Sequence, residues 1–241
     1  MSDSIRFLLA DGDFYEAPQD SEQLDFSRLP AMAQIPENIG TMQQLRSLSF
    51  RGATADFFAV QVESDYHHPL HYLPDSIGNL LHLEVLDLAG TKIQHLPESI
   101  GYLENLQVLN LSSCTHLKSL PKSIGKLKKL RVLALANSSL EQLPESIGEL
   151  DSLQVLQLSR SSIKELPPSI CQLRNLRKLD LTDVFVQGVS VFAAASPHQP
   201  QLILDDLRAY FERRQEGDML TFEFDAEEEV NRAMKVAIQQ Y

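Results

Sequence analysis

The sequence predicts an α/β solenoid with a curved parallel sheet on its inside, short helical turns on its outside and a cap at each end. Two observations predict it. The hexamer LPDSIG at Leu73 returns with small changes at residues 96, 120, 143 and 166. Between the hexamers, leucines recur at alternate positions, as in Leu86 and Leu88, which is the period of a strand.

The hexamers are spaced by 23, 24, 23 and 23 residues, and a related hexamer, IPENIG, begins at Ile35. One unit carries too few large apolar side chains to offset the backbone entropy of ordering it, roughly 1 to 2 kcal/mol per residue. A single unit therefore cannot fold alone, and only coils stacked in register form a stable core. We expect a right-handed coil whose strands line its inner face.

The hexamer fills the outer arc of each predicted coil. Its prolines, Pro97, Pro121, Pro144 and Pro167, restrict the backbone where a short helical turn begins. The glycine that follows in most copies has no side chain and permits a tight backbone. Each unit is thus expected to be a strand, a turn and a short helical segment.

The repeated pattern LPxSIGxLxxLxxLxLxxxxIxxLP resembles the leucine-rich repeats of plant intracellular immune receptors, of Ras-scaffold repeat proteins and of some bacterial effectors injected into host cells. The resemblance covers Leu73 to about Val186, with a degenerate extension back to Leu24. It implies the leucine-rich-repeat solenoid fold and a binding function. It does not imply which molecule is bound.

One position departs from the family pattern. Such repeats often carry Asn three residues after the second strand leucine, where its amide bonds the turns together. This chain has Thr91, Cys114, Ser138, Ser161 and Val184 there. Hydroxyl and thiol groups can still satisfy some buried backbone groups, so Cys114 is interpreted as a structural residue rather than a reactive thiol.

The predicted domain organisation has three parts. Residues 1–34 form an N-terminal cap with a degenerate repeat, residues 35–186 form the leucine-rich repeats with an insert at about 55–70, and residues 187–241 form a C-terminal cap. Within that cap, QLILDD at Gln201 is interpreted as a last strand, followed by a short helix with Leu207, Tyr210 and Phe211 on one side. Residues 225–241 predict an amphipathic helix that either packs on the solenoid or mediates association.

The inner face is the first candidate for a binding site, because its outward side chains form columns across the strands. The binding residues predicted from the columns are Arg51, Asp87, Asn110, Gln157, Arg160, Lys178 and Asp180, and Arg131 is added from a basic group. The columns are small and polar beside a stripe of valines, and they contain no aromatic residue, although aromatic residues and arginine dominate interface hot spots. The alternative is a contact through an edge or a terminal cap.

The insert is the second candidate. The spacing between the first two units is 38 residues, so about 15 residues have been added, and this stretch contains Phe57, Phe58, Tyr66 and Tyr72. A loop held by a rigid scaffold is a frequent binding element, and local packing is the alternative. The histidines of the same stretch, at 67, 68 and 71, are interpreted as lying in an exposed loop, because Pro69 disfavours the helix that would align them on a metal.

Charge and composition restrict the partners. The net charge is −12 and is concentrated in residues 1–30 and 205–241, so nucleic acid and anionic membranes are poor partners. A basic group, which comprises Lys118, Lys122, Lys126, Lys128, Lys129 and Arg131, either steers an acidic protein or is a solvated face. No secretory signal or long apolar run is recognisable, and two distant cysteines favour a reducing compartment.

The sequence contains no phosphate-binding glycine loop, zinc-ligand spacing or nucleophile elbow. We therefore expect a protein–protein interaction module without enzymatic activity, cofactor or metal, that binds through the concave face and the 55–72 insert. A monomer is favoured over an oligomer, and the protein is expected in the cytoplasm, or secreted into a host cell if it is an effector. It would serve as an adaptor or as a bacterial effector that acts on a host protein. The alternatives are the substrate-recognition part of an enzyme, such as a ubiquitin ligase whose catalytic domain is absent, and self-assembly through the last helix.

Overall fold

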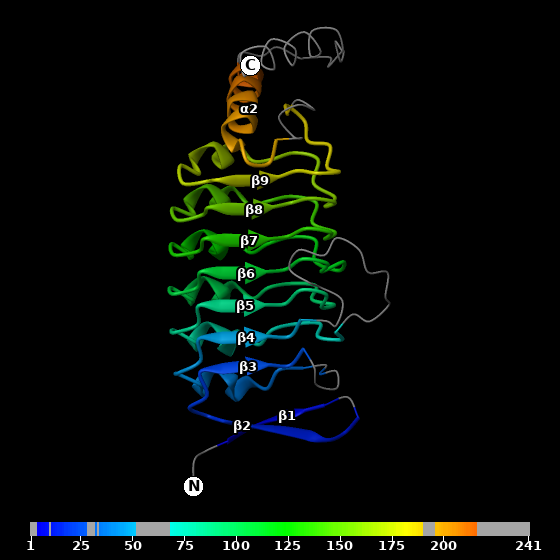
Figure 1. Ribbon diagram of the computed structural model, residues 1–241, viewed down its shortest axis with the longest axis vertical. Helices are drawn as coiled ribbons and strands as arrows, with labels where there is room; N and C mark the ends of the chain where they lie inside the picture. Colours follow the sequence, from blue (N-terminus) through cyan, green and yellow to red (C-terminus); the bar gives the residue numbers. More distant parts are fainter. Residues whose placement is uncertain are drawn as a thin grey trace.

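The computed structural model shows one stack of coils along a single axis, with a hairpin at the N-terminal end and a helix at the C-terminal end (Figure 1). The structure describes residues 4–9, 11–27, 32, 34–51, 68–189 and 196–215. Within these residues the dominant element is a parallel sheet of seven strands, in which each strand pairs only with its neighbours in sequence. This arrangement confirms the predicted α/β solenoid.

Each coil contributes one three-residue strand to the sheet. The strands are β3 (Gln23–Asp25), β4 (Ser47–Ser49), β5 (Val85–Asp87), β6 (Val108–Asn110), β7 (Val132–Ala134), β8 (Val155–Gln157) and β9 (Lys178–Asp180). The register is constant, with Leu86 opposite Leu109 and Leu109 opposite Leu133. β3 shows that the degenerate repeat at Leu24 forms a full strand of the sheet.

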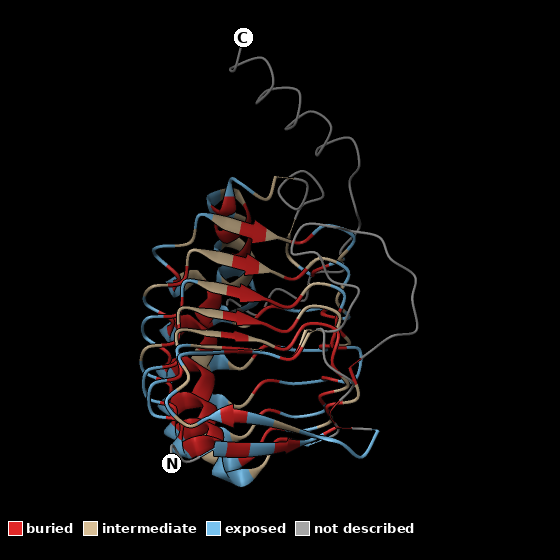
Figure 2. Cartoon of the chain, turned by 60° about the horizontal axis from the view of Figure 1, so that its bottom comes forward, coloured by how far each residue is buried: buried red, intermediate tan, exposed pale blue. Residues whose placement is uncertain are grey.

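The core is a column of inward-pointing side chains from successive strands. In most strands the middle residue, such as Leu86 or Leu156, is fully buried while both flanking residues are half-buried (Figure 2). The alternation follows from the two-residue period of a strand, which places neighbouring side chains on opposite sides of the sheet. The face opposite the core, which we call the strand face, is therefore built from the residues that flank each leucine.

The outer arc of each coil is a single 3-10 turn. These turns are η1 (Glu37–Thr41), η2 (Asp75–Asn79), η3 (Glu98–Tyr102), η4 (Lys122–Lys126), η5 (Glu145–Glu149) and η6 (Pro168–Gln172). An extended proline precedes each turn, and its carbonyl oxygen accepts the first hydrogen bond of the turn, as Pro121 does from the amide of Ile124 at 3.1 Å. The prolines thus fix where each turn begins, as the hexamer predicted.

Successive turns approach one another most closely at the glycine of each hexamer. A Cβ atom on Gly78, Gly101, Gly125 or Gly148 would lie within 2.7 Å of a serine carbonyl oxygen in the next coil. These glycines do not have positive φ angles, so close approach between coils, rather than an unusual backbone conformation, requires them.

The N-terminal cap is an antiparallel hairpin of β1 (Ser4–Leu8) and β2 (Phe14–Pro18). One face of the hairpin is buried through Ile5, Phe7 and Ala17. Phe7 packs against Phe26, which stacks in turn on Phe50 with 4.9 Å between the ring centroids. The hairpin therefore closes the first coil with a row of aromatic rings.

The C-terminal end is closed by a helix, α2 (Pro200–Gln215), and not by a strand. The prediction of a strand at QLILDD was wrong, because these residues form the first turns of α2. Ile203, Leu204 and Leu207 are buried on one side, and Phe211 is half-buried one turn further. This spacing is helical, and α2 packs against η6 and β9.

The repeat resumes earlier after the insert than predicted. His68 pairs in parallel with Thr91, and Tyr72 pairs with His95, so residues 68–72 already belong to a coil. His68 is only 7% exposed, which corrects the expectation that it lies in an exposed loop. No helix in the described part of the chain is long and apolar enough to cross a membrane.

Candidate functional site

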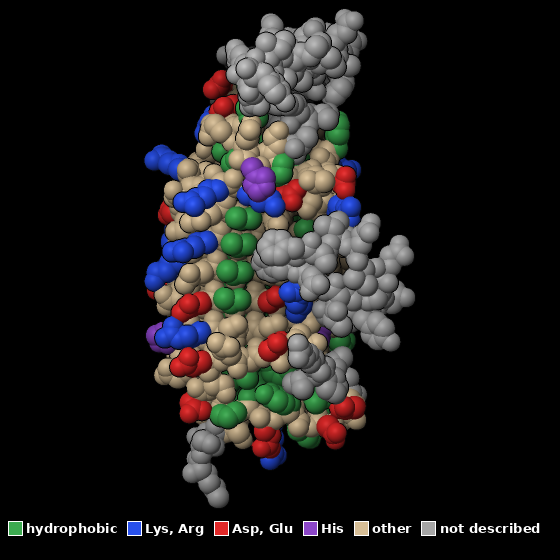
Figure 3. Space-filling model, in the orientation of Figure 1, with side chains coloured by type: hydrophobic (Ala, Val, Ile, Leu, Met, Phe, Trp, Pro, Cys, Tyr) green, Lys and Arg blue, Asp and Glu red, His purple; other side chains and the backbone are tan. Residues whose placement is uncertain are grey.

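A stripe of four valines crosses the middle of the strand face. Strand pairing places Val85 beside Val108, Val108 beside Val132 and Val132 beside Val155, and all four side chains are half-buried. Figure 3 shows this column of hydrophobic side chains between charged and polar ones. At about 4.8 Å between strands, the stripe is about 14 Å long. We call it the valine stripe, and Ser47 and Lys178 continue its column at the two ends.

The next column, formed by the last residue of each strand, contains four of the predicted binding residues, Asp87, Asn110, Gln157 and Asp180. Pairing brings together Asp87, Asn110, Ala134, Gln157 and Asp180 in that order. Three of these side chains also bond to their own backbone. The Oδ1 atoms of Asp87, Asn110 and Asp180 each accept the amide of the residue two positions on, at 3.0 to 3.1 Å.

These hydrogen bonds form local turns in which an Asp or Asn side chain caps the backbone as it leaves the strand. Sequence reasoning assigned these residues to partner contact and missed this second role. Asn110 is fully buried on the strand face, whereas Gln157 is half-buried and has no hydrogen bond of this kind in the described structure. Substitutions at Asp87, Asn110 and Asp180 therefore change the scaffold as well as the surface.

Burial raises the pKa of Asp87 above its usual value, and the hydrogen bond from Ala89 and the nearby Arg51 oppose this shift in part. A raised pKa means that the folded protein holds this proton to higher pH than the unfolded chain. The stability contributed by Asp87 is therefore present at low pH and is lost as the pH rises through the carboxyl titration.

Asp87→Asn is therefore expected to raise the free energy of unfolding at pH 7, by less than about 1 kcal/mol. Asparagine keeps the acceptor for Ala89 and carries no charge to desolvate, as Asn110 shows in the next coil. Urea denaturation between pH 3.5 and 7 should show the gain growing with pH. Asp180→Asn is the control, because Asp180 makes the same turn but lies 3.9 Å from Lys178 Nζ, and its replacement should give no gain. A loss at pH 7 from Asp87→Asn would contradict the assignment.

The residues immediately before the strands form a charged row beside the valine stripe. Arg46 Nη1 contacts Glu84 Oε1 at 2.6 Å, and Gln107 Nε2 lies 3.4 Å from the same carboxylate. Further along, the row continues with Arg131, Gln154 and Arg177 before β7, β8 and β9. Arg131 and Arg177 are exposed and have no ion pair within the described part of the chain.

The opposite border of the strand face is a column of residues in the left-handed conformation, with φ between 55° and 68°. Its members are Gly90, Ser113, Asn137, Arg160 and Asp183. This conformation costs on the order of 1 kcal/mol for a residue with a side chain. Arg160 Nε donates to Asp183 Oδ2 at 3.0 Å, so the predicted contact residue Arg160 is partly held by its neighbour.

Several predicted contacts lie outside the described residues. These are Phe57, Phe58 and Tyr66 of the insert, and the segment 225–241 for which the sequence predicts a helix. Tyr72 is described and is 52% exposed, with its hydroxyl oxygen accepting a hydrogen bond from Gln34 Nε2 at 2.7 Å. Arg51, the last described residue before the insert, is half-buried in the column that follows the strands.

The column where similar repeats often carry asparagine lies inside the coils at Thr91, Cys114 and Ser138 and is half-buried at Ser161 and Val184. Thr91 Oγ1 donates to the Leu88 carbonyl at 2.7 Å, and Cys114 Sγ donates to the same oxygen at 3.2 Å. Burial raises the pKa of Cys114 to about 11, so its thiol stays protonated at neutral pH. This confirms the structural interpretation of Cys114.

His68 belongs to the same column, which sequence reasoning missed. Its backbone amide donates to Gly90 O at 2.9 Å, and its ring lies edge-on to Phe50. The ring nitrogens lie 3.4 Å from the amide of Met32 and 3.3 Å from that of Leu70, and a neutral ring can accept at one of them. Burial lowers the pKa of His68 to about 4. No cluster of metal-binding side chains occurs among the described residues.

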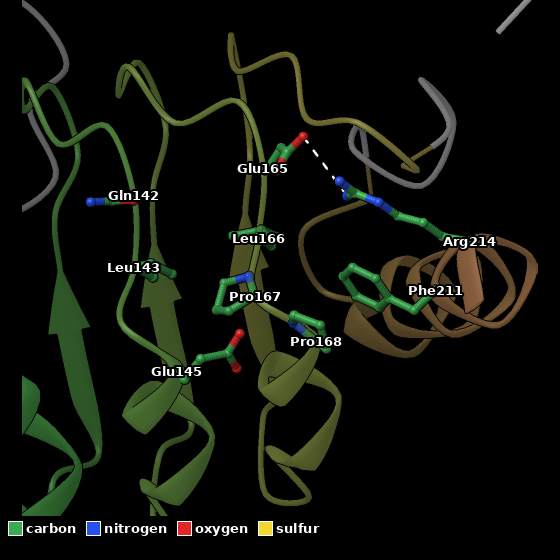
Figure 4. A pocket seen from close by; sticks show the side chains of 9 residues that line it. All are labelled: Gln142, Leu143, Glu145, Glu165, Leu166, Pro167, Pro168, Phe211 and Arg214. Atoms are coloured by element: carbon green, nitrogen blue, oxygen red, sulfur yellow. Dashed lines mark ion pairs between the residues drawn. The ribbon is translucent and has the colours of Figure 1, made fainter. Parts of the chain in front are cut away.

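One open groove of about 360 Å³ lies on the side of the helical turns, where α2 meets the last coils (Figure 4). Leu166, Pro167 and Phe211 line it, and Arg214 Nη1 lies 3.9 Å from Glu165 Oε1 across it. Because apolar residues of the solenoid and of α2 face each other here, the groove is the seam between the cap and the coils.

A protein-family model described as "Leucine-rich repeat region" matches this chain twice, at residues 63–135 and 107–188. Together the two matches span residues 63–188, slightly more than half of the chain. No curated protein matches the chain as a relative. Many solved structures do match it.

Three of these structures illustrate the range. A leucine-rich-repeat protein of Leptospira interrogans is 29% identical over 66% of this chain and 42% of its own, with a TM-score of 0.45. A TDR receptor is 26% identical over 65% of this chain and 25% of its own, with a TM-score of 0.51. The leucine-rich-repeat domain of the type III effector XopL is 28% identical over 62% of this chain and 57% of its own, with a TM-score of 0.48. This chain spans less than two thirds of each.

Proposed function

This chain belongs to the leucine-rich-repeat family, and from that premise we propose that it is a recognition module that binds a protein partner through its strand face. The leucine-rich-repeat fold generally supports protein–protein interaction. The observation that carries the proposal here is the valine stripe, because four half-buried valines in register form a continuous apolar surface outside the core. Apolar surface framed by polar and charged residues is typical of interaction sites.

The proposed contact residues differ in what their side chains already bind. Arg131 and Gln157 lie beside the valine stripe, Lys178 continues its column 3.9 Å from Asp180, and Arg160 borders the strand face, where it pairs with Asp183. Asp87 and Asp180 offer the partner only those polar atoms that their backbone turns leave open, and Asn110, which is buried, offers almost no surface. The valines and the basic residues are therefore expected to contribute most of the affinity.

The insert belongs to the proposal as a second contact. Its described anchors, Arg51 and His68, lie at the border where the chain leaves β4, because His68 donates to the carbonyl of Gly90 in the left-handed column. Phe57, Phe58 and Tyr66 would supply the aromatic side chains that the strand face lacks. A triple change of these three to Ser should weaken partner binding by at least about tenfold, measured with the captured partner.

The activity proposed is binding without catalysis. Burial raises the pKa of both cysteines, which keeps their thiols protonated and supports a structural role for them. An adaptor, an effector or the recognition part of a larger enzyme would use the same surface, since each must first bind its target. Examination of the captured protein for covalent change would distinguish the recognition part of an enzyme from an adaptor or an effector.

The test is capture of proteins from the source cell with the full chain and with Val132→Ser/Val155→Ser. Loss of two interface valines costs about 1 to 2 kcal/mol each, so the variant should bind its partner at least about tenfold more weakly. Leu81→Ser/Tyr102→Ser is the matched control, because these side chains are 49% and 57% exposed and lie off the strand face. Quantitative mass spectrometry measures the proteins that each variant captures. Partners retained by the valine variant and lost by the control would overturn the proposal.

A further inference from the structure

The strand face has opposite charge at its two ends. Its charge can be counted over the two outward positions of each strand and the residue before it. Around β3 to β5 the charged members are Glu22, Asp25, Arg46, Glu84 and Asp87, which give a net charge of −3. Around β7 to β9 they are Arg131, Arg177, Lys178 and Asp180, which give +2.

The strand between these ends carries no charge. β6 contributes Val108 and Asn110, with Gln107 before it. The valine stripe runs from β5 to β8 and therefore bridges the acidic end and the basic end. Figure 3 shows basic side chains beside the upper part of the column and acidic ones beside its lower part.

The basic side chains at the two ends of the strand face differ in whether they form ion pairs. Arg46 is held by Glu84 at 2.6 Å, whereas Arg131 and Arg177 have no ion pair among the described residues. Lys178 Nζ is 3.9 Å from Asp180, which is the outer limit of an ion pair. Arg131 and Arg177 thus have no counter-charge among the described residues, and Lys178 shares its charge with Asp180, in a chain whose net charge is −12.

We infer that the partner contacts this face through a segment with apolar side chains on the valine stripe and carboxylates over Arg131, Arg177 and Lys178. The inference rests on the proposed function and adds the chemistry of the partner. A charge of opposite sign near each of these cations is favourable, and a basic segment would be repelled at this end of the strand face. The negative charge elsewhere on the chain acts weakly here, because salt screens exposed charges beyond about 10 Å at 0.1 M.

The probe that tests the inference is a displayed library of random 12-residue peptides, selected on the full chain. The expected result is enrichment of peptides that are rich in Asp and Glu and contain Val, Leu, Ile or Phe. Selection on Arg131→Glu/Arg177→Glu/Lys178→Glu should remove that acidic bias. Individual peptides, measured by fluorescence anisotropy, should bind this triple variant at least about tenfold more weakly, and 0.5 M salt should weaken their binding to the wild type.

The matched control is Lys118→Glu/Lys122→Glu/Lys126→Glu, which changes the net charge by the same amount on exposed lysines away from the strand face. It should leave both the selected sequences and their affinities unchanged. Because three charge reversals can disturb folding, Arg131→Gln/Arg177→Gln provides a milder variant, checked by circular dichroism, and should show part of the same loss.

The outcomes separate the inference from the proposed function. Peptides that lack acidic bias but are lost on Val132→Ser/Val155→Ser would overturn the inference and leave the strand face as the binding surface. Acidic peptides that respond equally to both triple variants would also overturn it, because bulk charge alone would explain them. Enriched peptides that ignore the valine variant would overturn both, and a selection without enrichment would exclude a linear segment as the partner.

Discussion

Gly125→Ala is expected to lower the free energy of unfolding by about 3 kcal/mol. A Cβ atom on Gly125 would lie 2.5 Å from the carbonyl oxygen of Ser146 and 2.8 Å from the Ser146 Cβ in the next coil. The obstacle is backbone, so no side-chain rotation can relieve it, and the two coils must separate. Urea denaturation followed by far-ultraviolet circular dichroism measures the loss.

The sign of this change is itself a test. Where space allows it, replacement of glycine by alanine in such a conformation stabilises a protein by about 0.4 to 1 kcal/mol, because the unfolded chain loses freedom. Gly125 does not have a positive φ angle, so alanine meets no backbone penalty of that kind. A more stable Gly125→Ala protein would show that the coils are not in close contact there.

Cys171 provides the matched control for the glycine positions. It occupies the position of the hexamer glycine in the last coil, where α2 replaces a further stacked turn. A side chain is accommodated at this position, and Cys171 Sγ lies 3.9 Å from the carbonyl of Leu204 in α2. Cys171→Ala should therefore cost less than about 1 kcal/mol. A cost equal to that of Gly125→Ala would remove the stacking explanation.

Acidification from pH 6.5 to pH 4 is expected to cost the protein about 3 kcal/mol of stability through His68 alone. The pKa of His68 is lowered to about 4 in the folded protein by burial, against 6.5 for an unperturbed histidine. Between these values the unfolded chain binds a proton and the folded protein does not. The stability is therefore complete above pH 6.5 and falls as the pH falls, until the folded protein also binds the proton near pH 4.

The measurement is urea denaturation across pH 4 to 7.5 for the wild type and for His68→Gln. Glutamine keeps a hydrogen-bond acceptor of similar size and does not titrate, so the variant should lose much of the acid-side slope, whatever its stability at pH 7. His95→Gln is the control, because His95 is an exposed histidine in the next coil and its loss should leave the slope in place. An unchanged slope in His68→Gln would show that other groups cause the acid sensitivity.

The strand register could be predicted because the inward leucine repeats at a fixed distance in successive units. Leu86, Leu109, Leu133 and Leu156 occupy one column in the structure as they do in the aligned sequence. The valine stripe followed directly from the same alignment, because the residue before each of these leucines must point the other way. Regular spacing thus fixed both the core and the surface opposite it.

The segment at Gln201 was mispredicted because a short apolar run fits a strand and a helix equally well. What decides the structure is the later positions Leu207 and Phe211, which continue the apolar side of a helix to Gln215. The helical period of the apolar residues can be recognised over the 16 residues of α2, whereas the six residues QLILDD alone fit either a strand or a helix.

His68 was missed for a different reason, because the insert interrupts the count of residues from the preceding strand. The residues that follow the insert nevertheless carry the repeat pattern. His68, Leu70 and Leu73 have the same spacing as Thr91, Ile93 and Leu96 in the next unit. Counting backwards from the hexamer would have placed His68 in the buried column.

The candidate site was less predictable than the fold. Sequence alone does not show that Asp87 and Asn110 turn their side chains to their own backbone, because this depends on the conformation after the strand. The opposite charges at the two ends of the strand face also escaped prediction, because they emerge only when the residues before each strand, such as Glu84 and Arg131, are counted with the columns.

Every strand from β3 to β9 pairs only with its neighbours in sequence, so the length of the protein increases by one strand spacing with each repeat. Duplication of one 23-residue unit would push β9 and α2 outward by one step of about 4.8 Å and leave the seating of every other coil as it is. Duplication of repeats can therefore increase the distance between Glu84 and Arg177 by multiples of one strand spacing, while the residues around each of them stay the same. The distance between two charged groups on the strand face and the local surroundings of each group can therefore change independently.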